Sequence, residues 1–189
     1  MTDTMTATLS ETSLQQATND IEAIIASEEA RYYTARDAIS TFKINVLCDV
    51  LGDENPIYRD EQAAKDAGHP GVVAPPTALQ VWSMSNLNEA PTSSPVDKAY
   101  DILRRAGLPK VVAVNGNQHY NRYLTPGEVI TSKETVQSLS PVKQTALGVG
   151  MFITTLLTFM SDNEEVVGTM QFRTLWYAPN TSLDTLKGI

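Results

Sequence analysis

The chain has very little of what metal centres and disulfide scaffolds are made from. Cys48 is its only cysteine, and His69 and His119 are its only histidines in 189 residues. One cysteine excludes an intrachain disulfide and a CxxC metal site, and two histidines argue against a metal-dependent mechanism. We therefore expect a protein that uses no metal and no bound cofactor.

Positive charge and long apolar runs are also scarce. Its 14 Lys and Arg residues are scattered and outnumbered by 22 Asp and Glu residues, so the net charge is −8 and binding to a nucleic-acid backbone has no electrostatic support. The longest apolar stretch, residues 147–160, contains Gly and Thr and is too short to span a bilayer. Residues 1–13 have neither the basic start nor the apolar core of a secretory leader. These absences predict a cytoplasmic protein that binds neither nucleic acid nor a membrane.

The first half of the chain does show helical periodicity. Residues 13–29 predict a helix that starts at a capping box on Ser13, and residues 34–52 predict a second helix with one apolar stripe. That stripe consists of Ile39, Phe42, Val46 and Val50. Residues 76–84 predict a buried helix, and residues 96–106 predict a short amphipathic helix.

The second half is rich in strand-forming residues. Turns separate four such runs, at residues 110–124, 128–139, 143–161 and 166–177. Loops as short as these connect antiparallel neighbours, so we expect a meander. Helices in the first half and strands in the second predict an α+β fold with one sheet packed on one principal helix.

The length fits a single folded domain. We assign residues 1–33 to an N-terminal tail and helix, residues 34–178 to the domain, and residues 179–189 to a linker or terminal segment.

One short stretch has the pattern of a chemical site. In Gly52-Asp53-Glu54-Asn55-Pro56 the glycine ends a helix and Asn-Pro bends the chain, so that Asp53 and Tyr58 face one region. Two such groups can be held around one water molecule. On the local sequence alone, a plain helix stop with an Asx turn is the favoured interpretation.

The longer pattern adds a family resemblance. Gly52-Asp53-Glu54-Asn55-Pro56-Ile57-Tyr58-Arg59-Asp60, then Ala63-Ala64 and residues 68–77, resemble the signature of MaoC-like (R)-specific enoyl-CoA hydratases. The resemblance extends over residues 34–177. Residues 74–77 and 80–84 are similar to the N-terminal-type dehydratase domain, which includes the large subunit of actinobacterial hydratases for steroid side-chain CoA esters.

The resemblance implies a hot-dog fold, in which an antiparallel sheet wraps around a central helix and pairs with a second hot-dog domain. It also implies hydration of a 2-enoyl thioester. In the family, the Asp and His of the motif activate water. A backbone N–H at the start of the central helix holds the thioester oxygen as negative charge develops there.

The sequence departs from this signature at two places. Tyr58 stands where the family has its catalytic histidine, and a phenol with a pKa of about 10 is a poor base at neutral pH. Pro75 and Pro76 stand where the family has His-Gly, and proline has no N–H to donate to an oxyanion. We therefore expect a degenerate motif at Asp53, Asn55 and Tyr58, and no complete active site in this chain.

Other residues are expected to bind substrate rather than to react. They are Ala74, Pro75, Thr77, Trp82 and His119. Core packing explains Trp82 equally well. His119 is either a polar residue on a sheet face or a replacement for the missing acid. Arg173 is a candidate for pairing with a CoA phosphate, although a solvated strand residue is the default, and His69 is expected in a loop.

The preferred interpretation is the non-catalytic half of a heteromeric hydratase. A smaller hot-dog subunit with intact Asp and His would supply catalysis, while this chain shapes the pocket for an acyl-CoA or acyl-carrier thioester and is inactive alone. The acidity does not exclude CoA, which needs only a few local cations or amides. Two alternatives stay open: a self-sufficient homodimeric hydratase or 3-hydroxyacyl dehydratase that uses Asp53 with Tyr58 or His119, and an acyl-CoA-binding scaffold without a catalytic partner.

Overall fold

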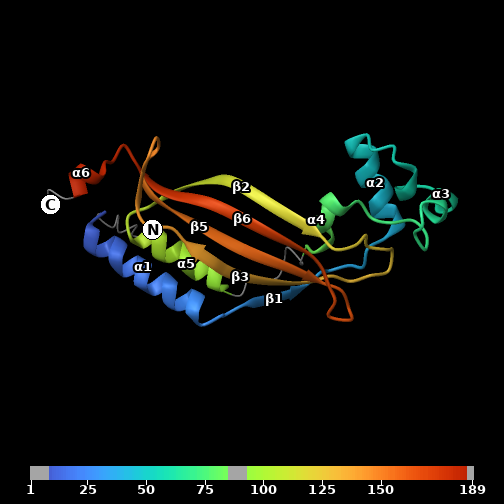
Figure 1. Cartoon of the computed structure of the whole chain (residues 1–189), viewed down its shortest axis with the longest axis horizontal. Coiled ribbons are helices and arrows are strands. Elements are labelled where there is room, and N and C mark those ends of the chain that lie inside the picture. Colours follow the sequence, from blue (N-terminus) through green and yellow to red (C-terminus); the bar gives the residue numbers. More distant parts are fainter. Residues whose placement is uncertain (1–8, 85–92, 187–189) are drawn as a thin grey trace, which may run out of the picture.

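Six strands form one antiparallel sheet in the computed structural model, which describes residues 9–84 and 93–186. The sheet order is β1-β3-β5-β6-β2, and β4 pairs with the start of β5. The strands are β1 (Arg31–Thr34), β2 (Lys110–Tyr120), β3 (Thr131–Leu139), β4 (Lys143–Thr145), β5 (Gly148–Met160) and β6 (Val166–Pro179). The two longest strands, β5 and β6, lie in the middle of the sheet (Figure 1).

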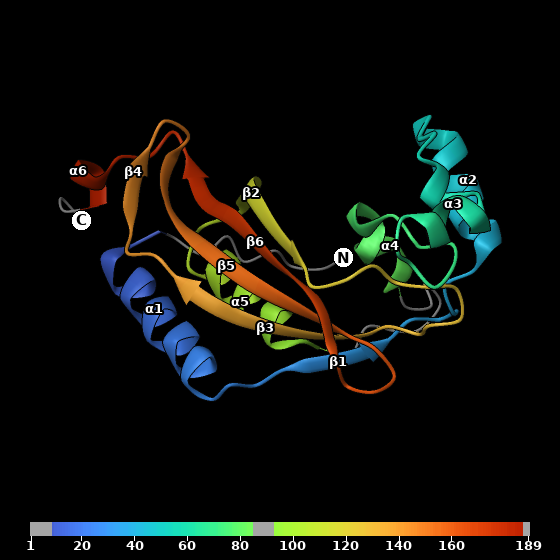
Figure 2. The same ribbon diagram turned by 45° about the vertical axis from the view of Figure 1, so that its right-hand side comes forward.

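Two long helices lie along one face of this sheet, and most of the short helices gather at one of its ends (Figures 1 and 2). The helices are α1 (Glu11–Ala26), α2 (Thr41–Leu51), the 3-10 turn η1 (Pro56–Tyr58), α3 (Glu61–Asp66), the 3-10 turn η2 (Pro76–Ala78), α4 (Leu79–Trp82), α5 (Pro95–Arg105) and α6 (Leu183–Leu186).

The first core lies between the sheet and the pair α1 and α5. Ile21 of α1 and Leu103 of α5 are fully buried in one apolar cluster with Met151 and Ile153 of β5. Both helices begin with a capping box, at Ser10 and at Ser94, which satisfies amides at each N-terminus. This core stabilises the sheet on which the other elements pack.

The principal helix expected at residues 76–84 was placed wrongly. That segment contains only the 3-10 turn η2 and the four-residue helix α4. Pro75 and Pro76 contribute no amide, and the Ser83 hydroxyl donates to the carbonyl of Gln80 (3.1 Å), which competes with continued helical bonding. The helices that pack on the sheet are α1 and α5. The α5 helix corresponds to the amphipathic helix predicted at residues 96–106, and it packs on the sheet in place of the helix expected at residues 76–84.

The second core lies at the end of the sheet that carries α2, α3 and α4. It contains Ile44 and Cys48 of α2, Tyr58, Trp82 of α4, and residues of β5 and β6 such as Phe159. The elements that enclose this core are short, and tight turns rather than long helices position them. The motif found in the sequence belongs to this core.

The predicted apolar stripe on the second helix is also wrong. Residues 31–34 form β1, and α2 starts only at Thr41, after the cap at Ser40. Ile39 is buried before the helix begins, whereas Phe42 and Val50 are 76% and 77% exposed. The helix has apolar residues on both faces, so periodicity alone could not identify the face that packs. The first helix was likewise misplaced by a few residues, because Ser10, not Ser13, is its cap.

The expected meander is correct for β3, β5 and β6 but not for β2. The β2 strand pairs with β6 through registers such as Val111 with Trp176, and so lies at the sheet edge far from β3. The run at residues 143–161 is divided into β4 and β5 by a turn before Gly148, whose φ is +129°. The segment from residue 121 to residue 130 is therefore a long connection across the end of the sheet, not a hairpin turn.

The described residues near both ends of the chain contact the rest of the fold. The α1 helix shares the first core, and β1 pairs with β3, so the sheet includes residues on both sides of the expected boundary at residue 33. In residues 179–186, the amide of Leu183 donates to Gln144 Oε1 (2.9 Å). In the described ranges, none of the helices has the length and apolarity needed to cross a membrane.

Candidate functional site

The motif turn is held by its own polar groups. The α2 helix ends at Gly52, whose φ of +66° lies in the left-handed region that glycine adopts readily. The Asp53 carboxylate accepts a hydrogen bond from the amide of Asn55 (3.0 Å), and the Asn55 side chain accepts one from the amide of Ile57 (3.3 Å). Arg59 donates to the Asp53 carbonyl (3.2 Å). The turn is thus an Asx-type helix stop, and at least one oxygen of Asp53 is used to build it.

Tyr58 points into the second core and not into solvent. Its side chain is 7% exposed, and its ring centroid lies 6.4 Å from that of Tyr123. Burial raises the pKa of Tyr58 to about 12, and Tyr123, Asp53 and Cys48 add to this effect. The phenol is therefore protonated at neutral pH, and it lies where the signature places a histidine.

His69 lies closer to this site than the sequence indicated. Its ring meets the Tyr123 ring edge-on, with the centroids 4.8 Å apart, so His69, Tyr123 and Tyr58 form a row of rings. The residue was expected only in a loop. This contact could not be predicted because it depends on where Tyr123 lies, and Tyr123 belongs to the long connection after β2.

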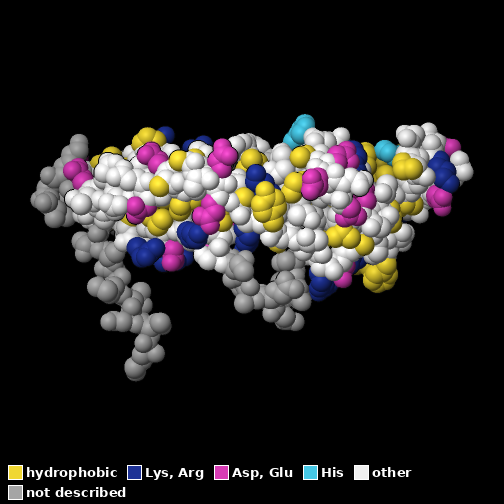
Figure 3. Space-filling view, turned by 90° about the horizontal axis from the view of Figure 1, so that it is seen from below, with side chains coloured by type: hydrophobic (Ala, Val, Ile, Leu, Met, Phe, Trp, Pro, Cys, Tyr) yellow, Lys and Arg dark blue, Asp and Glu magenta, His cyan; other side chains and the backbone are white. Residues whose placement is uncertain are grey.

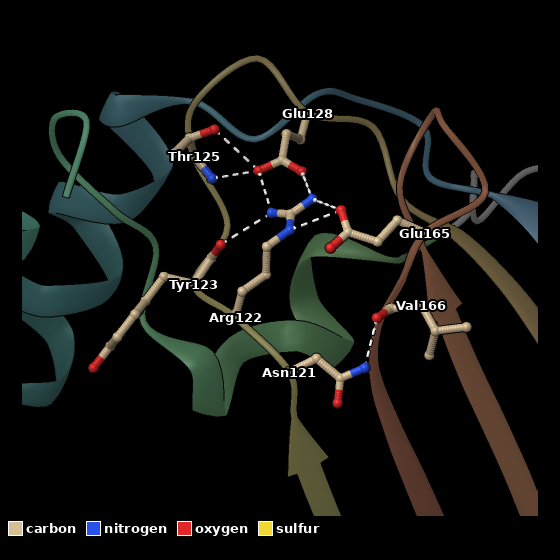
Figure 4. A network of polar contacts seen from close by, with 7 residues as sticks. All are labelled: Asn121, Arg122, Tyr123, Thr125, Glu128, Glu165 and Val166. Carbon is tan, nitrogen blue, oxygen red and sulfur yellow. Dashed lines mark hydrogen bonds and ion pairs between the residues drawn. The ribbon is translucent and has the colours of Figure 1, made fainter.

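An ion-pair network fixes that connection (Figure 4). Arg122 makes two hydrogen bonds to the Glu128 carboxylate (3.0 and 2.7 Å) and pairs with Glu165 (2.9 Å) from the turn between β5 and β6. Thr125 donates its amide and its hydroxyl to Glu128. Figure 4 shows the Tyr123 side chain pointing away from this network, while its carbonyl accepts from Arg122 (3.0 Å). The network thereby fixes the backbone from which Tyr123 reaches Tyr58.

The network also changes proton affinities. Burial alone would raise the pKa of Glu128, but the bonds from Arg122 and Thr125 outweigh burial and lower it. The pKa of Arg122 is raised by Glu128 and Glu165. This role of Arg122 was not predicted from the sequence. The available signal was a basic residue and an acidic residue flanking the turn Thr125-Pro126-Gly127.

The corner before α4, at residues 74–77, has few backbone N–H groups that are free to donate a hydrogen bond. Ala74 donates its amide to the carbonyl of Leu124 (2.8 Å), and Pro75 and Pro76 have none. Thr77 is exposed, and its amide belongs to the first turn of a 3-10 helix, where amides have no partner within the helix. Pro75 and Pro76 therefore supply no backbone donor at this corner.

The remaining candidates divide between the two faces of the sheet. Trp82 is 4% exposed and shares the second core with Tyr58. His119 is exposed and aligned with Thr169, on the sheet face opposite α1 and α5. Arg173 lies on that same face, with its guanidinium 4.7 Å from the centroid of the Phe152 ring. The structure thus brings Tyr58 and Trp82 together and places His119 and Arg173 elsewhere.

Comparison with known proteins gives consistent results. A family model described as "FAS1-like, dehydratase domain region" matches residues 25–170. The chain is 38% identical over 167 residues to the "3-oxo-4,17-pregnadiene-20-carboxyl-CoA hydratase alpha subunit" of Mycobacterium tuberculosis, with 88% of this chain and 52% of that protein covered. It is 36% identical over 154 residues to a "Probable enoyl-CoA hydratase alpha subunit" of Thermomonospora curvata, with 79% and 48% covered. The chain therefore spans about half the length of these curated relatives.

The solved structures agree with this assignment. A chain of the ChsH1-ChsH2 complex from Mycobacterium tuberculosis superposes with a TM-score of 0.81 at 37% identity, covering 89% of this chain and 98% of that one. A "MaoC-like dehydratase" superposes with a TM-score of 0.60 at 18% identity, over 89% of this chain and 47% of that one, which shows the fold alone. The fold is thus the hot-dog fold, and the chain belongs to the FAS1-like dehydratase family.

Proposed function

We propose that this chain is the non-catalytic hot-dog half of a heteromeric enoyl-CoA hydratase, which adds water to a 2-enoyl thioester. One observation carries the proposal: Tyr58 occupies the position of the catalytic histidine, buried and with a pKa of about 12. A group that exchanges protons in catalysis works best with a pKa near the working pH, and Tyr58 is far from it. The names of the relatives, both alpha subunits of hydratases, support the heteromeric arrangement.

The proline corner supports the same conclusion. Hydration builds negative charge on the thioester oxygen, and a preorganised N–H at that position typically contributes about 10²–10³ in rate. Pro75 and Pro76 cannot supply one. A complete site is therefore expected in the partner, a smaller hot-dog subunit with the intact Asp and His.

The edge strand β2 supports the mode of association. It is 11 residues long, every residue except Tyr120 is exposed, and it pairs with β6 on one side only within the described residues. Long unpaired edges are normally paired or covered. The partner subunit would extend the sheet along β2, which makes a double hot dog.

A bulky acyl group is the proposed substrate class. The relative from Mycobacterium tuberculosis is named for a pregnadiene carboxyl-CoA ester. In this chain the segment that would cover an acyl chain, residues 76–84, contains only one short helical turn after a 3-10 turn. A substrate of this kind, a CoA thioester, fits the predicted cytoplasmic location. Ala74, Pro75, Thr77, Trp82 and His119 remain the proposed substrate-binding residues.

The test compares the chain alone with the chain mixed with a motif-intact partner subunit, by following loss of the enoyl-thioester absorbance. We expect negligible turnover from the chain alone and robust turnover from the mixture. Robust turnover by the chain alone, abolished in Asp53→Asn, would instead establish the self-sufficient hydratase. Binding of acyl-CoA with no turnover in any mixture would establish the scaffold.

A further inference from the structure

The two faces of the sheet differ in charge. Strand registers define the outer face, which is the face opposite α1 and α5. On β5, Met151 and Ile153 point into the first core, so Phe152 and Thr154 point outward. Arg173 is aligned with Thr154 and therefore also lies on the outer face.

Across the described strands, the outer face has cations and no carboxylate. Lys133 is aligned with Thr158, Lys143 with Gly150, and Lys110 with Tyr177, which is itself aligned with Gly150. All three therefore join Arg173 on this face. Among the residues of these strands the only acidic one is Glu134, which lies on the inner face and pairs with Arg31 (3.2 Å). In a chain of net charge −8, such a segregation of charge is conspicuous.

Among the described residues, no carboxylate neutralises the cations of the outer face. Across residues 9–84 and 93–186, no ion pair involves Lys110, Lys133, Lys143 or Arg173. Lys143 and Arg173 lie 5.9 and 4.7 Å from the centroid of the Phe152 ring, and Lys133 lies 6.0 Å from that of Tyr32. Aromatic contacts hold these side chains in place without cancelling their charge.

Elsewhere the charges are mixed. The side of the molecule seen in Figure 3 has acidic and basic side chains intermingled along its length. On the helices, Lys65 pairs with Glu61 and Arg104 with Asp101. The outer face thus differs from these helices, where cations lie next to carboxylates.

The spread of the cations indicates the size of what they bind. The partners of Lys143, Arg173 and Lys133 on β5 are residues 150, 154 and 158. Steps of four residues correspond to roughly 13 Å each at about 3.3 Å per residue, so the row extends over roughly 26 Å. The charged ends of Lys143 and Arg173 converge on the Phe152 ring, whereas Lys133 lies at the Tyr32 ring. A single phosphate at Phe152 would leave Lys133 unengaged, whereas a carboxylate-rich protein surface reaches all three.

The geometry points to the outer face as a docking surface for another protein that presents a carboxylate-rich surface. A two-fold contact between the outer faces of two copies does not fit, because it would oppose cations to cations. The hydratase partner proposed above extends the sheet at β2 and leaves the outer face open. This inference concerns a different surface from that of the hydratase function and does not depend on it.

The probe for this surface is a fluorescein-labelled decaglutamate peptide, followed by fluorescence anisotropy with the whole chain, and with the chain bound to its hot-dog partner if one is found. An ionic strength of about 0.1 M limits electrostatic reach to roughly 10 Å, so that the local face rather than the net charge is measured. We expect binding that weakens at least tenfold in the double variant Lys143→Gln with Arg173→Gln. The matched control, Lys43→Gln with Lys65→Gln, removes the same charge from ion-paired sites on helices and should change the affinity less than twofold.

Three results would overturn the inference: no binding of the peptide, equal weakening in both double variants, or displacement of the peptide by low concentrations of adenosine 3′,5′-bisphosphate. The last result would assign the cations to the phosphates of a nucleotide instead of to a protein. Circular dichroism of each variant confirms that the sheet is intact, so that a loss of binding reports the face itself.

Discussion

The two cores of this molecule are built by different means. In the first, the long helices α1 and α5 begin at capping boxes and bury continuous apolar faces on the sheet. In the second, short turns enclose a tyrosine with a raised pKa and leave Phe42 and Val50 exposed on α2. The first core is thus formed by long helix faces, and the second by short turns that position individual side chains such as Tyr58.

The largest expected effect concerns chemistry at the second core. Tyr58→His restores a group that exchanges protons near neutral pH, but the oxyanion donor stays absent because Pro75 and Pro76 have no N–H. We expect the single variant to remain at least about 10²-fold slower than the triple variant that adds Pro75→His and Pro76→Gly. The measurement is hydratase turnover without a partner, and Tyr58→Phe serves as the control for loss of the hydroxyl.

If the single variant reached the rate of an efficient enzyme, the argument from the missing donor would be wrong. The amide of Thr77 would then be the first group to examine.

The second prediction concerns the first core. Leu103→Ala removes a fully buried side chain between α5 and the sheet and should lower the free energy of unfolding by about 2–5 kcal/mol. Urea denaturation measures this change. A loss below about 1 kcal/mol would show that α5 is not the principal helix of the sheet.

The third prediction uses two glutamates with opposite pKa shifts. The pKa of folded Glu128 is lowered, so its stabilisation is present above the unfolded pKa of about 4.3 and is lost as the pH falls through the folded pKa. Glu128→Gln should therefore reduce stability by about 1–2 kcal/mol at pH 7 and by much less at pH 3. Urea melts at both pH values measure it.

Glu134 provides the contrast, because burial raises its pKa even though Arg31 acts in the other direction. The stabilisation that Glu134 contributes to the folded state is present below the unfolded pKa and is lost as the pH rises through the folded pKa. Glu134→Gln should thus gain stability relative to the unmodified chain as the pH rises. The same pH trend in both variants would contradict the assignment of the two environments.

The smallest effect is expected on the exposed side of α2. Phe42→Gln should change the free energy of unfolding by less than about 0.5 kcal/mol, because the ring is 76% exposed. Ile44→Ala, at a fully buried position of the same helix, should lower it by about 2–5 kcal/mol. Reversal of this order in thermal melts would show that α2 packs through its other face.

Sequence reasoning succeeded where one local pattern admits one structure. The glycine stop of α2 is an example, and the residues from Gly52 to Asp60 were sufficient to indicate the family. It failed in two ways. Residues 76–84 are as apolar as a helix core, yet two local prolines and Ser83 restrict them to short turns. Elsewhere the outcome depends on distant partners.

The site shows the same limit. The replacement of the histidine by Tyr58 could be read directly. Its raised pKa, however, comes mainly from burial in the second core, and Tyr123, from a distant connection, adds to it. The roles of Asp53, Asn55 and the residues proposed to line the pocket stay predictions. Nothing in the local sequence indicated that β2 would pair with β6 instead of β3.

The open edge of β2 has a consequence for how the cell must make this protein. An orphan copy presents an 11-residue strand with exposed Val111, Val112 and Val114 to any other unpaired strand it meets during synthesis. Such edges template aggregation. If the proposed partner covers this strand, production of the two chains has to be matched, because each surplus copy of this chain would expose the edge.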